Sequence, residues 1–237
     1  MINIKHILLA NQKKLKKPPK NSSFICLYSG GKDSALALSI ASEFATPSAL
    51  ITCVGHDKSL FHEHSYDIIK TQSKKMNINL ECFNGHWKEL IKLAKIYKYY
   101  KKKGVKTVVF GDLNDIKNAN RKIIACKLAG LKPCMPLWNV SYDELINLIK
   151  KYNIVSVITI VRPSMLDVKW LGKEFNQSIY ESLCGNRIDP FGEKGEFHTT
   201  LVNSNLFSSP INYSINNIFS TVDKFGVKEC ANIEFLS

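Results

Sequence analysis

Apolar and polar positions along the chain form blocks that predict strands and helices in turn. Continuous apolar runs with the length of buried strands occupy residues 24–28, 49–54, 80–83 and 106–110. Segments with helical spacing of apolar residues follow them at 34–44, 65–76, 88–102 and 118–129. Continuously apolar strands separated by helices are typical of βα units, so we predict an α/β fold with a parallel sheet and helices on both faces.

The pattern changes after a break at residues 133–138. Ser141 and Glu144 have the spacing of a capping box and predict a helix that extends to about residue 152. A strand at 154–161, a helix at 177–183 and a strand at 196–202 follow, and the last 30 residues have a mixed pattern. We therefore predict a smaller α+β C-terminal subdomain that starts near residue 136.

Composition narrows the class of protein. The chain has 237 residues, of which 45% are hydrophobic and 22% are charged, and this excludes a disordered, collagen-like or coiled-coil protein. No apolar run approaches the ~20 residues that cross a bilayer. The N-terminus lacks the features of a secretory signal, so we expect a cytoplasmic location and no membrane partner.

The formal net charge of +13 comes from two lysine clusters, at residues 1–20 and 88–106. We interpret residues 1–22 as a lysine-rich extension. Two such clusters can attract nucleic acid or phosphates, but only three of the 33 basic residues are Arg, the residue that phosphate and base recognition favours. A compositional bias of the whole chain explains the charge better than RNA binding does.

The seven cysteines include no C-x-x-C pair, which argues against a zinc ribbon or a thioredoxin-like redox motif. Cys26, Cys53 and Cys82 lie in apolar strand-like runs, where a free cysteine usually packs as a small buried side chain. We expect reduced thiols without a catalytic role.

Residues 29–34 form the most informative motif and lie between the first strand and the first helix. Their sequence is Ser29, Gly30, Gly31, Lys32, Asp33 and Ser34. Two glycines let the backbone approach a ligand closely, the N–H groups at a helix N-terminus attract anions, and the lysine and the hydroxyls add charge and donors. An ordinary turn with Asp33 or Ser34 as the helix cap is the alternative.

This motif resembles the S-G-G-x-D-S loop of the PP-loop ATP pyrophosphatases. The resemblance implies a Rossmann-like domain over residues 23–135 that binds ATP with Mg²⁺ and splits it into AMP and pyrophosphate. Residues 29–34 would then bind the pyrophosphate, with catalytic roles for Lys32 and Asp33 and a metal contact for Asp33. From the residues alone, Asp33 and Asp112 can each contact nucleotide or metal, or cap a helix.

A longer series of motifs resembles the diphthine–ammonia ligase family, which includes bacterial relatives of uncertain substrate. The series comprises residues 109–112, 130–133, 136–138, 171–173 and 188–199, and it ends in Gly-Glu-Lys-Gly-Glu-Phe-His-Thr. The chain departs from the family at Phe191, where the family often has Cys, and at residues 203–207, where it often has D-G-P-x-F. The resemblance implies ATP contacts for Gly111 and Asp112 and a substrate-binding role for residues 136–237.

Glu193, Glu196 and His198 form a polar cluster in the last of these motifs. Glu196 and His198 share one face if both belong to a strand. Such a cluster can serve as a base toward ammonia or bind an amine, whereas a solvated surface turn is the alternative. With the family resemblance we favour a catalytic role for all three residues. A further cluster of His56, His62 and His64 follows the second strand and has no clear metal set.

The resemblance predicts an ATP-dependent amide ligase. It would adenylate a carboxylate, and ammonia would then displace AMP. The expected partners are ATP, ammonia and a carboxylate acceptor, for which diphthine on translation elongation factor 2 is one candidate, and a homodimer stays open. The alternatives are a PP-loop enzyme that modifies tRNA, a related pyrophosphatase with another acceptor, and a non-catalytic ATP sensor.

Overall fold

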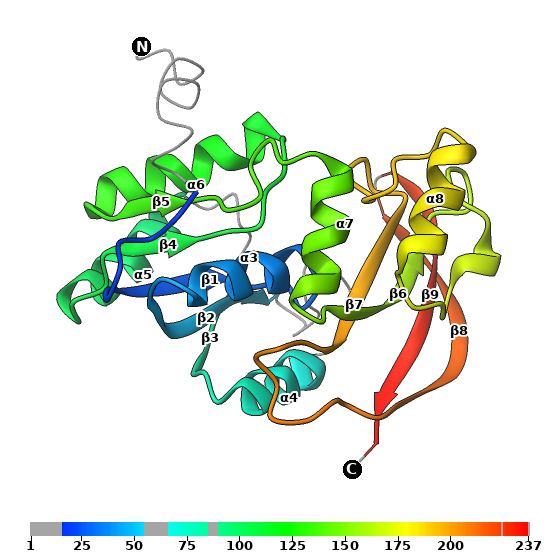
Figure 1. The fold of residues 1–237 in the computed structure, drawn as a ribbon, viewed down its shortest axis with the longest axis horizontal. Helices are drawn as coiled ribbons and strands as arrows, with labels where there is room; N and C mark the ends of the chain where they lie inside the picture. Colours follow the sequence, from blue (N-terminus) through cyan, green and yellow to red (C-terminus); the bar gives the residue numbers. More distant parts are fainter. Residues whose placement is uncertain (1–15, 55–65, 85–89, 224, 237) are drawn as a thin grey trace. The chain divides into compact units, whose positions relative to one another are not determined.

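The structure is a computed structural model that describes residues 16–54, 66–84, 90–223 and 225–236. Most of the lysine-rich extension and all three clustered histidines (56, 62 and 64) lie outside these ranges. The chain divides into an N-terminal unit, Met1–Ser29 with Asp33–Val140, and a C-terminal unit, Gly30–Lys32 with Ser141–Ser237 (Figure 1). Three residues of the 29–34 loop therefore belong to the C-terminal unit.

The N-terminal unit is built on a five-stranded sheet (Figure 1). Its strands are β1 (Ser23–Leu27), β2 (Thr46–Val54), β3 (Leu80–Asn84), β4 (Thr107–Val109) and β5 (Lys132–Cys134). They lie in the order β3-β2-β1-β4-β5, and all neighbouring pairs are parallel. The predicted parallel α/β sheet is confirmed.

Four helices connect these strands. They are α3 (Lys32–Ser42), α4 (Tyr66–Met76), α5 (Leu90–Lys102) and α6 (Ile116–Ala129). Because crossover connections are right-handed, the strand order places α3 and α4 on one face of the sheet and α5 and α6 on the other. Helix α6 begins after Asp115, whose carboxylate accepts from the N–H groups of Lys117 and Asn118, and it ends at Gly130 in the left-handed conformation.

The core of this unit confirms that both faces of the sheet are covered. Ile25 and Leu27 of β1 pack into the apolar cluster that α5 and α6 contribute to. The alternate residues Phe24 and Cys26 point to the opposite face and are also fully buried. A strand that is buried on both faces reads as a continuous apolar run, which is why β1 was visible in the sequence.

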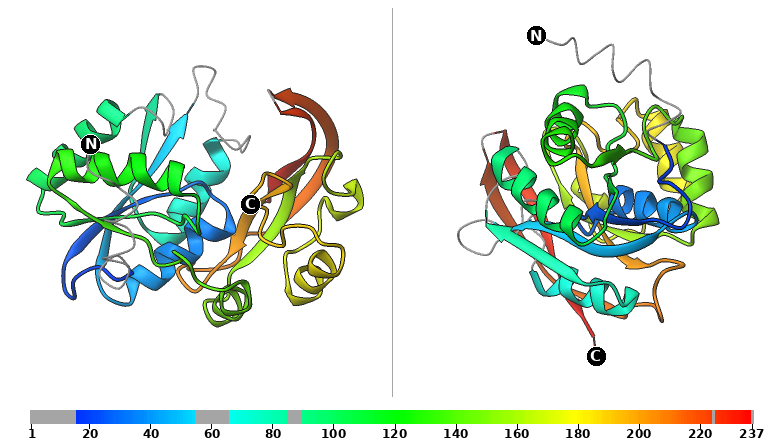
Figure 2. Two further views of the ribbon diagram at one scale, coloured as in Figure 1. Left: turned by 90° about the horizontal axis from the view of Figure 1, so that it is seen from above. Right: turned by 90° about the vertical axis from the view of Figure 1, so that its left-hand side faces the viewer.

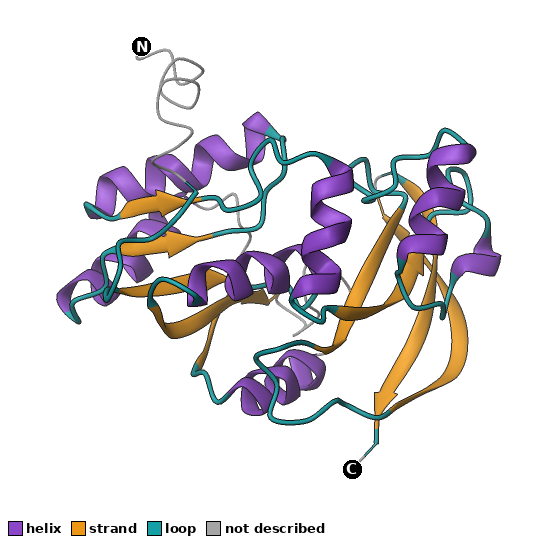
Figure 3. Cartoon of the chain, viewed as in Figure 1, coloured by secondary structure: helices purple, strands orange, loops and turns teal. Residues whose placement is uncertain are grey.

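The C-terminal unit contains a separate antiparallel sheet with helices (Figures 2 and 3). Its strands are β6 (Val155–Val161), β7 (Phe197–Asn203), β8 (Tyr213–Asp223) and β9 (Gly226–Phe235), in the order β7-β6-β9-β8. Its helices are α7 (Tyr142–Lys151), the 3₁₀ helix η1 (Val168–Trp170) and α8 (Gln177–Gly185). The predicted α+β character is confirmed, and the Ser141 hydroxyl caps α7 by accepting from the Glu144 N–H.

Two elements differ from the sequence-based expectation. Residues 132–134 form the edge strand β5, although Pro133 suggested a break, because an edge strand tolerates a residue that cannot donate to the ladder. The mixed C-terminal segment is the long hairpin β8–β9, whose outer side chains include exposed apolar residues that hide the alternation.

The cysteines are all free, and one of them departs from expectation. Cys26 and Cys53 are buried, whereas Cys82 is exposed because β3 is an edge strand of its sheet. In the part of the chain that the structure describes, no helix is long and apolar enough to cross a membrane.

Candidate active site

The N-terminal sheet reverses its strand order between β1 and β4. These two strands are hydrogen-bonded neighbours, yet β1 continues through α3 to β2 on one side and β4 continues through α6 to β5 on the other. In open α/β sheets, ligands bind beyond the carboxyl ends of the strands at such a point. The loop after β1 contains residues 29–34 and the loop after β4 contains Gly111 and Asp112, so both predicted ATP motifs lie at this edge.

The 29–34 loop has the geometry of an anion-binding turn. Gly30 has φ +84°, a conformation that glycine adopts without strain, and helix α3 begins two residues later. The N–H and the hydroxyl of Ser29 both donate to Ser34 Oγ, over 3.2 and 3.1 Å. Because Asp33 and Ser34 lie in the first turn of α3, neither precedes the helix as a cap. The serine hydroxyls and the N–H groups at the start of α3 are of the kind that bind an anion.

The second loop approaches the first one at Gly111. A Cβ atom on residue 111 would lie 2.7 Å from the backbone carbonyl oxygen of Asp33, which is closer than real side chains come. Gly111 is thus the residue that lets the loop after β4 pack against the start of α3. The close approach brings the two motifs together.

The neighbouring Asp112 has a partner within its own unit. Its carboxylate accepts from Lys122 Nζ of α6 at 2.8 and 2.6 Å, and both side chains are largely buried. The alternative role as the cap of the next helix is wrong, because Asp115 caps α6. Lys122 was not singled out from the sequence, although its position two helical turns after the cap is compatible with a pair to the preceding loop.

The side chain of Lys32 is buried. A loop lysine that contacts phosphate should be exposed, but Lys32 is only 4% exposed and its Nζ donates to the Phe191 carbonyl oxygen at 2.7 Å. Its backbone N–H donates to Thr199 Oγ1 at 3.1 Å. The side chain therefore packs within the C-terminal unit, and the role of Lys32 in ATP binding and catalysis stays a prediction.

The motif at residues 188–199 begins with a turn that Asp189 organises. The Asp189 carboxylate accepts from the Phe191 N–H at 3.0 Å and from the Tyr142 hydroxyl at 3.1 Å, and the Gly192 N–H donates to the Asp189 carbonyl oxygen. Gly192 has φ +76° and lies against the Phe197 backbone, which leaves no room for a side chain. The turn fixes the direction of the Phe191 carbonyl group.

The three polar residues that follow this turn have different environments. Glu193 is exposed, Glu196 is buried, and His198 is half-buried in β7. Oε2 of Glu196 accepts from the Lys194 N–H at 3.1 Å, so this carboxylate closes the glycine-rich turn. Burial of Glu196 rules out the alternative of a fully solvated surface pair.

Strand β7 begins at Phe197, and its alternation separates His198 from the lysine. Phe197 and Thr199 both contact Lys32 and therefore lie on one face, whereas His198 lies on the other. Thr199 and Phe191 were part of the sequence motif without an assigned role.

Tyr28, the last residue before the loop, is fully buried, and its hydroxyl has no hydrogen-bond partner in the described structure. Burial, and to a smaller extent the neighbouring Cys26, raises the pKa of this phenol well above its ordinary value. Tyr28 is thus a buried packing residue immediately before the loop.

The described side chains can be searched for the ligands of a metal ion such as Mg²⁺. Among the described residues, no group of three His, Cys, Asp or Glu side chains is arranged to bind a metal ion. The phosphates of ATP can themselves supply most of the ligands of a Mg²⁺ ion, which usually binds through one or two carboxylates plus substrate phosphates. Asp33, which is half-buried in the first turn of α3, stays the predicted metal contact.

The N-terminal unit combines a parallel α/β sheet with a glycine-rich loop after β1. A comparison with known protein families matches this part of the chain. Residues 22–133 match the family model described as "Diphthamide synthase N-terminal domain". The match extends from the start of β1 into β5 and includes both ATP motifs, and it covers slightly less than half of the chain. This part of the chain is therefore similar to a PP-loop domain of diphthamide synthase type.

The chain was also compared with curated proteins and with solved structures. No curated protein matches the chain. One similar solved structure is described as "The crystal structure of predicted subunit of tRNA methyltransferase from Methanocaldococcus jannaschii DSM". It shares 16% sequence identity, and the match covers 77% of this chain and 97% of that chain with a TM-score of 0.41. Similarity at that level does not transfer the described activity to this chain.

Proposed function

We propose that the protein is an ATP-dependent amide ligase of the diphthine–ammonia ligase type. The observation that carries the proposal is the loop of residues 29–34 at the topological switch point, packed against Gly111 of the loop that follows β4. The match of residues 22–133 to the diphthamide synthase N-terminal domain supports the same reaction class.

The first half-reaction uses the loop of residues 29–34 and the start of α3. A carboxylate oxygen of the acceptor attacks the α-phosphorus of ATP, the bond to the β-phosphate oxygen breaks, and pyrophosphate leaves. The backbone at Gly30 and Gly31, the hydroxyls of Ser29 and Ser34, and the N-terminus of α3 would bind the leaving pyrophosphate. Mg²⁺, when bound, neutralises charge on the phosphate oxygens.

The second half-reaction releases AMP. Ammonia attacks the carbonyl carbon of the acyl-adenylate, the C–O bond to AMP breaks, and one proton leaves the nitrogen. We assign this step to the polar residues of the 188–199 motif, with Glu196 or His198 as the acceptor of that proton and Glu193 at the exposed end of the turn. Diphthine is one candidate acceptor, because its trimethylammonium-bearing side chain ends in the carboxylate that amidation would consume.

The test is a product analysis with ATP, ammonium and candidate carboxylates. We expect AMP and pyrophosphate in equal amounts, and an amide only when ammonium is present. Ser34→Ala removes the oxygen that accepts from both Ser29 donors and should reduce pyrophosphate release by about 10²-fold, the order expected for one stabilising contact.

Ser42→Ala is the matched control in the same helix. Its hydroxyl donates to the Leu38 carbonyl oxygen at the far end of α3, so this variant should release pyrophosphate at the wild-type rate. ADP and phosphate as the main products would overturn the proposal. Pyrophosphate release that requires RNA would favour the tRNA-modifying alternative instead.

A further inference from the structure

The ammonium group of Lys32 is enclosed by aromatic rings of the C-terminal unit. Its Nζ lies 5.5 Å from the ring centroid of Phe175, 5.2 Å from that of Phe191 and 5.4 Å from that of Phe197. Each distance is within the range of a cation–π contact. Together with the Phe191 carbonyl oxygen at 2.7 Å, these three rings form what we call the lysine cage.

The backbone beside Lys32 is attached to the same part of the structure. The Leu201 N–H of β7 donates to the Gly30 carbonyl oxygen at 2.8 Å, and the Lys32 N–H donates to Thr199 Oγ1 at 3.1 Å. Strand β7 is an edge of the antiparallel sheet, so its outer side is available for this pairing. Residues 30–32 are thus held against β7 by one backbone hydrogen bond and by one hydrogen bond to a β7 side chain.

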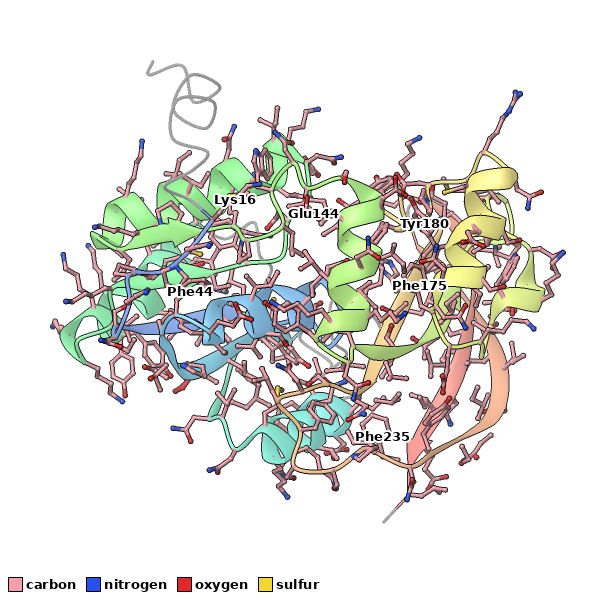
Figure 4. All side chains as sticks on the ribbon, viewed as in Figure 1. Lys16, Phe44, Glu144, Phe175, Tyr180 and Phe235 are labelled. Carbon is pink, nitrogen blue, oxygen red and sulfur yellow. The ribbon has the colours of Figure 1, made fainter. Side chains whose placement is uncertain are left out.

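The walls of the lysine cage are held by their own contacts. The Phe175 N–H donates to the Ser156 carbonyl oxygen of β6 at 2.8 Å, and Figure 4 labels Phe175 in this unit. The Phe191 ring stacks on Tyr142 of α7 with 4.9 Å between centroids, and Phe197 is the first residue of β7. Strand β6 therefore holds Phe175, helix α7 holds Phe191, and Phe197 belongs to β7 itself. The secondary structure of the unit thus fixes the positions of all three rings.

We propose that Lys32 is a positioning residue, whose caged ammonium holds residues 30–32 on β7 and so sets the shape of the pyrophosphate-binding loop. To reach a phosphate, the ammonium would have to give up the Phe191 carbonyl and three aromatic faces that replace its hydration. The consequence for ATP rests on the proposed function, whereas the anchoring of the loop does not.

Hydrogen exchange tests the anchoring without any ligand. We expect the Leu201 amide to exchange at least tenfold faster in Lys32→Met, which keeps the side-chain length and removes the charge. Phe175→Leu, which keeps the lysine and removes one ring, should accelerate the same amide to a smaller extent. Amides of β1 and β4 should exchange at wild-type rates in both variants.

Lys169→Met is the matched control in the same unit. Lys169 also lies over an aromatic ring, that of Trp170 at 5.8 Å, but its side chain is 65% exposed. This variant should leave the Leu201 amide unchanged. An unchanged Leu201 amide in Lys32→Met would overturn the proposal, and so would a Leu201 amide that responds equally to Lys169→Met.

A spectroscopic measurement separates positioning from direct phosphate contact. Three nearby ring faces should shift the ε-CH₂ proton signals of Lys32 upfield relative to those of Lys169. We expect this shift to persist when Mg²⁺ and pyrophosphate are added to saturation. A return of the Lys32 signals toward those of Lys169 would show that the ammonium moves to the anion, and would overturn the proposal.

The two proposals fail in different ways. If calorimetry detects no pyrophosphate binding to the wild-type protein, the proposed function fails, while the exchange of the Leu201 amide still decides whether Lys32 anchors the loop. If pyrophosphate binds and Lys32→Met leaves both the Leu201 amide and the affinity unchanged, the positioning role fails and the proposed function stands.

Discussion

Gly111 lies directly against the backbone of Asp33. A Cβ atom at position 111 would come within 2.7 Å of the Asp33 carbonyl oxygen and 3.0 Å of the Ser34 nitrogen. Both of these are backbone atoms at the start of α3, so they cannot swing aside as a flexible side chain would. The loop after β4 therefore packs against the start of α3 only with glycine at this position.

Gly111→Ala should consequently displace the start of α3. We expect a loss of stability of about 1–3 kcal/mol, as for other overpacked sites, and an ATP affinity at least about tenfold lower. Gly185→Ala is the control, because a Cβ there meets no atom within 4 Å and the residue ends helix α8. Denaturant unfolding and nucleotide titration measure both effects. Wild-type behaviour of Gly111→Ala would contradict the close packing of the two loops.

Glu196→Gln tests whether Glu196 acts in amide formation and not in ATP binding. Glutamine keeps the shape and an oxygen that can still accept from the Lys194 N–H, but it removes the charge and the basic carboxylate. We expect ATP affinity within about twofold of wild type and amide formation lower by about 10²–10⁴-fold, the usual range for loss of a general base. Glu193→Gln, at an exposed position, is the matched comparison. A parallel collapse of ATP affinity would contradict this assignment.

Tyr28→Phe should stabilise the protein. The Tyr28 hydroxyl is buried without a partner in the described structure, so its removal recovers a desolvation cost, and we expect a gain of about 1 kcal/mol. Tyr152→Phe provides the contrast, because the Tyr152 hydroxyl accepts from Lys151 Nζ at 3.1 Å and its loss should cost about 0.5–1.5 kcal/mol. Urea unfolding measures both changes, and a Tyr28→Phe variant less stable than wild type would refute the packing role.

Buried thiols should make stability depend on alkaline pH. Burial raises the pKa of Cys134 from 9.0 to about 12 and also raises the pKa values of Cys26 and Cys126. Above pH 9 the unfolded chain loses protons that the folded chain retains, so the stability present below pH 9 falls as the pH rises. Each thiol contributes a slope of about 1.4 kcal/mol per pH unit up to its folded pKa.

The measurement is urea unfolding between pH 8 and pH 11 under reducing conditions. Cys134→Ala removes one of the three thiols and should flatten the decline by about 1.4 kcal/mol per pH unit between pH 10 and pH 11. An equal decline in the wild type and in this variant would mean that Cys134 ionises similarly in the folded and unfolded chains.

Much of the fold was predictable because its signals are local. Strands such as β1 are buried on both faces and read as apolar runs, while Ser141 and Gly130 mark a helix start and a helix end by their own backbone chemistry. The hairpin β8–β9 was missed because its strands carry exposed apolar side chains that obscure the period of two. Strand β5 was missed because its short edge position tolerates a proline.

By itself, the sequence determined the parallel sheet, and it predicted an anion-binding role for residues 29–34. Only the tertiary structure decided where the Lys32 side chain goes, and that Gly111 meets Asp33. The rings that enclose Lys32 come from positions 175, 191 and 197, more than 140 residues further along the chain. Periodicity and spacing report on neighbours within a few turns, whereas a contact over that separation depends on how β7 and the turn at Asp189 fold together.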